Sequence, residues 1–124
     1  MSSHDPTLTL EQIQEFIDEA EEYTRGETLE TLLLSRMKLR AFERVMLCIG
    51  EAVKRLPMDL RAAYPAVDWK GAAGMRDWVA HGYDGLDYDV LWKAVAEKLP
   101  GLRTTAAQML TDLGGPPPAE EMPG

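Results

Sequence analysis

Apolar residues recur at intervals of three and four along most of this chain, which is the spacing of amphipathic helices. The first such segment covers residues 9–25, with Thr7 or Thr9 as the expected N-cap and Gly26 beyond its end. Its apolar positions are Leu10, Ile13, Phe16, Ile17 and Ala20. The opposite face is rich in carboxylates, which we interpret as a solvated side rather than an acid/base pair, because an amphipathic helix presents a charged face to water.

The second predicted helix is the longest, over residues 27–56, because no proline interrupts it and its first interior glycine is Gly50. Its apolar stripe comprises Leu32, Leu33, Phe42, Val45, Met46, Ile49 and Val53. A polar seam runs beside this stripe, formed by Arg36, Arg40, Arg44 and Glu51. The seam is either surface charge or the lining of a cleft, and the spacing does not decide between the two.

The rest of the chain predicts shorter helices and a polar tail. Two prolines flank a connection with one helical turn at 58–63, and Asp68 is the expected N-cap of a helix over 69–81. Asp87 caps a last long helix, which Pro100 and Gly101 kink or divide. We therefore predict an all-α fold, an antiparallel bundle of four to five helices. Its expected parts are a flexible start (1–8), a helical domain (9–113) and a disordered tail rich in Pro and Gly (114–124).

Composition narrows the class of protein. The 124 residues suit one domain, and a net charge of -8 argues against a broad nucleic-acid surface while leaving room for a local basic patch. Cys48 is the only cysteine, which excludes an internal disulfide and paired-cysteine zinc sites. No apolar run reaches the length of a membrane span and no secretory leader is visible, so we expect a cytoplasmic protein.

One short segment concentrates chemistry-bearing side chains. Arg76, Asp77, His81 and Tyr83 fall within eight residues at the end of a predicted helix. An arginine and a histidine without a metal suit phosphodiester cleavage in RNA, where a base takes the 2'-hydroxyl proton and a cation stabilises the charge developing on the phosphate. Spacing alone favours a structural role for such a pair, because a histidine near an arginine on a helix is a common arrangement.

The run from Arg76 to Tyr83 resembles the signature of the HEPN superfamily, in the Arg-x-x-x-x-His-x-Tyr form of the HepT-like toxins. The resemblance extends over about residues 10 to 112, in the family's order and spacing. Five other segments also resemble the family: Ala41–Arg44, Ile49–Ala52 with its Gly-Glu-Ala step, Pro65–Trp69, Asp87–Trp92 and Leu99–Leu102. The chain departs from the family at Asp77, where asparagine is more usual, and at Ser35 and Arg40, where acidic residues are expected near the long helix.

This resemblance implies a homodimeric, metal-independent endoribonuclease without a cofactor, the toxin of a type VII toxin-antitoxin system. Arg76 and His81 would be catalytic. Independently of the resemblance, Asp77 lies four residues before His81 on the same helix face and can orient the imidazole. RNA would be the substrate, with no DNA or membrane partner expected. The antitoxin would be a minimal nucleotidyltransferase that transfers AMP to Tyr83. Gly71 and Gly74 on the 69–81 helix are the expected sites of close approach in the dimer.

Two other classes compete with this interpretation. The acidic charge favours a non-catalytic helical binding or scaffold subunit that partners a nucleotidyltransferase. A four-helix metal protein is disfavoured, because the only histidines are His4 and His81. We interpret Trp69, Trp78 and Trp92 as core or dimer packing rather than as platforms for base stacking.

Overall fold

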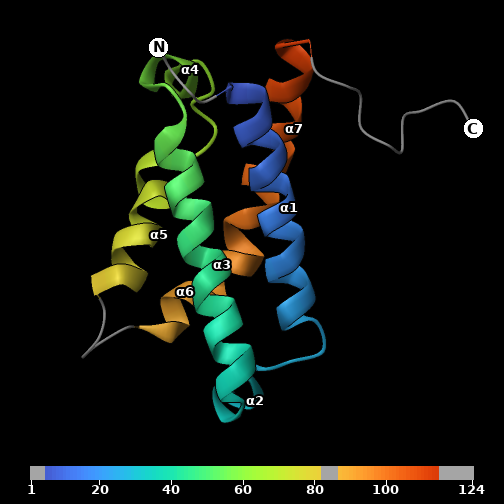
Figure 1. The fold of residues 1–124 in the computed structure, drawn as a ribbon, viewed down its shortest axis with the longest axis vertical. Helices are drawn as coiled ribbons and strands as arrows, with labels where there is room; N and C mark the ends of the chain where they lie inside the picture. Colours follow the sequence, from blue (N-terminus) through green and yellow to red (C-terminus); the bar gives the residue numbers. More distant parts are fainter. Residues whose placement is uncertain (1–4, 82–86, 115–124) are drawn as a thin grey trace, which may run out of the picture.

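The computed structural model describes residues 5–81 and 87–114, and the regular structure in this part of the chain is entirely α-helical (Figure 1). The helices are α1 (Pro6–Thr24), α2 (Leu29–Leu34), α3 (Arg36–Arg55), α4 (Met58–Ala62), α5 (Trp69–His81), α6 (Tyr88–Glu97) and α7 (Leu99–Asp112). The five longer helices form the bundle, and α2 and α4 are short segments between them. The predicted all-α bundle is confirmed.

Helix α3 is the central element of the bundle. It packs on α1 along one side and on α5 along another, while α1 also packs on α7 and α7 on α6. Figure 1 shows that α3 runs in the opposite direction to both α1 and α5. None of the described helices is long and apolar enough to cross a bilayer.

A single apolar core lies between these helices. Its largest fully buried side chains are Phe42, Leu10, Ile13, Ile17, Leu32, Met46, Ile49, Leu56, Leu91, Leu99, Met109 and Val53. Phe42 of α3 also meets the ring of Trp92 in α6 edge-on, with ring centroids 6.5 Å apart. Each fully buried side chain of this size contributes about 1.5–3 kcal/mol. Most of the periodic apolar positions therefore form the core, as the pattern predicts.

The first helix begins earlier than predicted. Asp5 is the N-cap, since its carboxylate accepts a hydrogen bond from the backbone N–H of Thr7 at 3.0 Å, and Pro6 occupies the first helical position. The expectation that Thr7 or Thr9 caps a helix starting at residue 9 is therefore wrong. An Asp-Pro pair suits a helix start better, because proline has no N–H to leave unpaired and its φ is already helical. Thr9 is instead buried.

The predicted single helix over residues 27–56 is also wrong, because the chain breaks at Ser35 into α2 and α3. The Ser35 hydroxyl accepts a hydrogen bond from the backbone N–H of Lys38 at 3.2 Å and so caps α3. Of the predicted stripe, Leu32 is buried but Leu33 is 43% exposed. The next residue, Leu34, which is not part of the stripe, is 86% exposed. A serine that caps its own backbone competes with helix continuation, and periodicity does not register that competition.

Later boundaries follow the predictions closely. Asp68 accepts a hydrogen bond from the backbone N–H of Gly71 at 3.0 Å, and α5 covers the predicted residues. Asp87 caps α6, and the last predicted helix divides at Lys98, so that Pro100 falls in the first turn of α7. Residues 1–4, 82–86 and 115–124 lie outside the described part, so the expected disorder of the tail stays a prediction.

Candidate functional site

Arg76 lies where α5 comes closest to α3. A Cβ atom built on Gly50 of α3 would be 2.4 Å from the backbone nitrogen of Arg76 and 2.9 Å from its Cβ. Both distances are far shorter than the 3.4–4 Å of an ordinary contact. Only a residue without a side chain fits at position 50, so Gly50 lets the backbone that carries Arg76 rest directly on α3.

The Arg76 side chain remains accessible despite this close backbone contact. It is 38% exposed, and its Nη1 donates to Oδ1 of Asp77 at 3.1 Å. Asp77 is 56% exposed, and an ion pair at such a surface contributes about 0–1 kcal/mol to stability. The pair therefore orients the guanidinium while leaving it within reach of an anion. The sequence predicts that Asp77 orients His81. The contact with Arg76 does not test that role, because the side chain of His81 lies outside the described residues.

His81 is the last residue of α5, five positions after Arg76. On a regular helix these positions are about 7.5 Å apart along the axis and about 140° apart around it. The side chain of His81 and the whole of Tyr83 lie outside the described residues. Their predicted roles therefore stay predictions.

A second polar cluster, which the sequence did not predict, joins α3 to the start of α6. Arg40 donates from Nη1 to both carboxylate oxygens of Glu43 at 3.0 and 3.1 Å, and the Tyr88 hydroxyl donates to Oε2 of the same carboxylate. Burial, the hydrogen bond to Glu43 and the charge of Glu43 raise the pKa of Tyr88. The i,i+3 spacing of Arg40 and Glu43 could have revealed half of the cluster, but Tyr88 is 45 residues away from Glu43.

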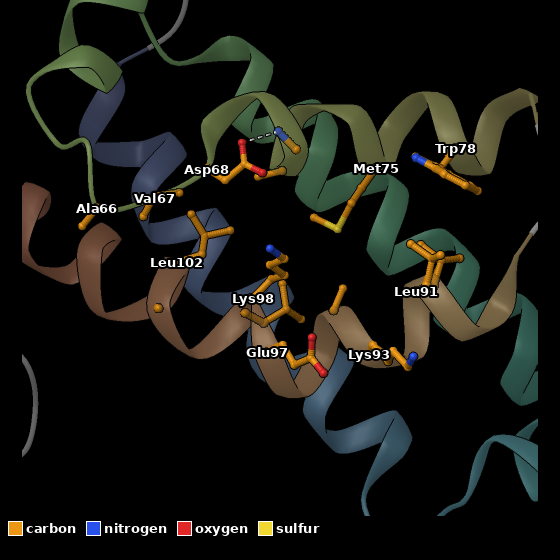
Figure 2. Close-up of a pocket in the computed structure, with 16 residues that line it drawn as sticks. Ala66, Val67, Asp68, Met75, Trp78, Leu91, Lys93, Glu97, Lys98 and Leu102 are labelled. Atoms are coloured by element: carbon orange, nitrogen blue, oxygen red, sulfur yellow. Dashed lines mark hydrogen bonds between the residues drawn. The ribbon is translucent and has the colours of Figure 1, made fainter.

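A groove of about 530 Å³ opens between α5 and the α6–α7 pair. Figure 2 shows Met75 and Trp78 of α5 across it from Leu91 of α6 and Leu102 of α7, and Lys98 also lines it. Trp78 follows Arg76 by two residues, or about 200° around the helix, so the groove lies on the other side of α5 from Gly50. Arg76 is not among its described lining residues. The groove and the Arg76 contact are therefore two separate surfaces of one helix.

The three tryptophans divide between the core and this groove. Trp69 is buried and its indole N–H donates to the carbonyl of Tyr64 at 2.8 Å, while Trp92 packs against the core. Trp78 is 45% exposed at the groove. The packing role is thus confirmed for two tryptophans.

Within residues 5–81 and 87–114, no three His, Cys, Asp or Glu side chains gather as metal ligands.

The chain is similar to one group of proteins over most of its length. The family described as "Ribonuclease HepT-like" matches residues 13–109, which include α3, α5 and Arg76. A protein of Thermococcus cleftensis named "Probable ribonuclease HepT" is 40% identical over 94 residues, which are 76% of this chain and 86% of that protein.

Two further relatives carry similar names. "Putative RNase MJ0127" of Methanocaldococcus jannaschii is 35% identical over 106 residues, covering 86% of this chain and 84% of the relative. "Putative RNase TTE0752" of Caldanaerobacter subterraneus is 34% identical over 105 residues, covering 85% and 94%. No solved structure matches the chain.

Proposed function

Because this chain belongs to the HepT-like ribonuclease family, we propose that it is a metal-independent RNA endonuclease in which Arg76 and His81 form the catalytic pair. The observation that carries the proposal is the placement of Arg76. Its backbone is fixed against Gly50, its guanidinium stays partly exposed, and α5 ends five residues later at His81. A positioned cation and an acid–base histidine on one helix suit RNA cleavage without a metal ion.

The proposed reaction uses the substrate's own 2'-hydroxyl as the nucleophile. Neutral His81 takes the hydroxyl proton as the oxygen attacks the neighbouring phosphorus, and Arg76 stabilises the charge that develops on the phosphate oxygens. The bond to the 5'-oxygen breaks, and the protonated imidazole returns its proton to that oxygen. The products are a 2',3'-cyclic phosphate and a 5'-hydroxyl, so protons and bonds balance without a metal ion. Asp77 acts by orienting the guanidinium, and in the proposed complex also the imidazole.

Substitution of the catalytic pair tests this proposal. Arg76→Ala and His81→Ala should each lower RNA cleavage in EDTA by about 10²-fold or more, since positioned acid–base groups contribute about 10²–10⁴-fold. Lys70→Ala is a matched control, because it removes an exposed cation from the same helix. Circular dichroism checks that the variants fold. Undiminished cleavage by both folded variants would remove these residues from catalysis and favour a non-catalytic scaffold subunit.

We further propose that the chain is the toxin of a type VII toxin-antitoxin system, silenced by AMP transfer to Tyr83. A bulky anion two residues past His81 would compete with the RNA phosphate for Arg76 and obstruct the site. Incubation with a minimal nucleotidyltransferase, ATP and Mg²⁺ should add the mass of AMP to the wild type but not to Tyr83→Phe. That variant should still cut RNA and resist neutralisation. If it is modified and silenced like the wild type, Tyr83 is not the acceptor.

The active form in this proposal is a homodimer. Support comes from the exposed apolar side chains Trp78 and Val90 at the groove, and from Gly74, where an added Cβ would meet nothing within 4 Å and leaves room for a second chain. The space beside Gly71, the other glycine predicted for the interface, is already filled, because a Cβ there would lie 2.3 Å from the Asp68 carboxylate. Light scattering at micromolar concentration should give twice the mass of one chain, and a monomer would contradict the proposed homodimer.

A further inference from the structure

Three arginines form a regular row along α3, which we call the arginine row: Arg36, Arg40 and Arg44. Successive members are four residues apart, so they rise by about 6 Å and turn by about 40° from one to the next. Arg36 and Arg44 are exposed residues, and the side chain of Arg40 is 63% exposed. The row is a local concentration of positive charge on a chain whose net charge is -8.

Stability of the fold does not account for these charges. Only Arg40 has a carboxylate partner among the described residues, namely Glu43, which is itself bound by Tyr88. Arg36 opens α3, whose first turn holds no acidic residue. A cation at a helix N-terminus faces the positive end of the helix dipole and is unfavourable there. Arg36 and Arg44 therefore have no carboxylate counter-ion among the residues that the structure describes.

The row begins level with the end of α5 along the axis of α3. Helices α3 and α5 run in opposite directions and touch at Gly50 and Arg76 (Figure 1). Both rise about 1.5 Å per residue, so the end of α5, five residues past Arg76, is level with about residue 45 of α3. Arg44 is thus level with the C-terminal end of α5. Arg40 and Arg36 lie about 6 and 12 Å farther along α3, beyond that end.

We propose that the arginine row is a track for the phosphates of single-stranded RNA, leading away from the Arg76–His81 motif along α3. The inference rests on the proposed ribonuclease function. A guanidinium binds phosphate through two parallel N–H donors, and a rigid helix holds three of them at a fixed interval. Such contacts set the register of the strand without reading its bases. The hydrogen bonds to Glu43 hold the middle arginine along the surface of α3.

Binding of a non-cleavable RNA tests the row independently of catalysis. The probe is a fluorescent 2'-O-methyl oligonucleotide, titrated with the wild type, Arg36→Ala, Arg44→Ala and Arg44→Lys over a range of salt concentrations. Each alanine variant should bind about threefold to tenfold more weakly, as for the loss of one exposed charge-assisted hydrogen bond. The slope of log affinity against log salt should fall by about 0.7 for each lost phosphate contact, and the lysine variant should keep the slope. Arg25→Ala, which removes an exposed arginine outside the row, should bind like the wild type.

Cleavage kinetics separate this inference from the proposed function. In the cleavage assay, Arg36→Ala and Arg44→Ala should raise KM on long RNA with little change in kcat, whereas Arg76→Ala lowers kcat. If both row variants bind the oligonucleotide as tightly and with the same salt slope as the wild type, the row is not a track, whether or not the protein cuts RNA. If the wild type binds through the row but cuts no RNA, the proposed function fails and the row stands. Variants that lose only association with the nucleotidyltransferase would overturn the track in favour of a protein-binding surface.

Discussion

The contact between Gly50 and Arg76 yields the sharpest test of how the fold positions the site. In Gly50→Ala, the new Cβ would lie 2.4 Å from the Arg76 nitrogen, where ordinary contacts begin at 3.4 Å. The Arg76 nitrogen belongs to a helix backbone and the new Cβ is bonded directly to another, so neither atom can rotate away as the end of a flexible side chain can. Helix α5 must therefore move from α3 by about 1 Å, carrying Arg76 with it.

The expected magnitudes follow from that displacement. Overpacking of this kind costs about 1–3 kcal/mol, from which a gain of up to about 1 kcal/mol in helix propensity is subtracted. We therefore expect Gly50→Ala to lower the free energy of unfolding by about 1–2 kcal/mol. A misplacement of about 1 Å in a catalytic group can cost about 10²-fold in rate. The folded variant should accordingly lose far more activity than its stability loss explains.

Urea denaturation and single-turnover cleavage, measured on the same preparation at 25 °C, check both numbers. Gly101→Ala is the matched control, because it makes the same change at an exposed helical position where an added Cβ meets nothing within 4 Å. The control should cut RNA like the wild type and be no less stable. If Gly50→Ala matches it in both urea midpoint and cleavage rate, then close packing at Gly50 does not hold Arg76 in place.

The remaining predictions concern stability. Phe42→Ala should lower the free energy of unfolding by about 3–5 kcal/mol, because this fully buried ring also packs edge-on against Trp92; a loss below about 1 kcal/mol in urea denaturation would contradict the described core. Ser35→Ala should cost about 1 kcal/mol by removing the cap of α3, and an unchanged thermal midpoint would argue for one continuous helix. Hydrogen bonds from Lys38 and Thr31 lower the pKa of the Glu27 carboxyl group in the folded protein. Ionised Glu27 therefore stabilises the fold above the unfolded carboxyl pKa of about 4.3, and this stabilisation is lost as pH falls through the lowered folded pKa. Glu27→Gln should therefore flatten the dependence of stability on pH in that window, and an unchanged acid denaturation curve would count against the pair.

Local signals in the sequence were sufficient for most of the helices. The 69–81 helix needed only the Asp68 cap and the apolar spacing, because both act within a few residues. The break at Ser35 was missed for the opposite reason. No glycine or proline lies near Ser35, and a serine there suits either a helix interior or an N-cap. Which of the two forms depends on tertiary packing, which buries Leu32 and leaves Leu34 exposed.

For the candidate site too, some features follow from the sequence and others only from the tertiary structure. The sequence by itself determined the residue types and their order, namely Arg76, Asp77 and His81 on one helix and three arginines in a row on another. The tertiary structure alone decided that Gly50 receives the backbone of Arg76, because that contact joins residues 26 positions apart on antiparallel helices. It likewise decided that Tyr88 binds Glu43 across 45 residues. Periodicity records which face of a helix is apolar, whereas the position along a neighbouring helix that meets it depends on how whole side chains fill the space between them.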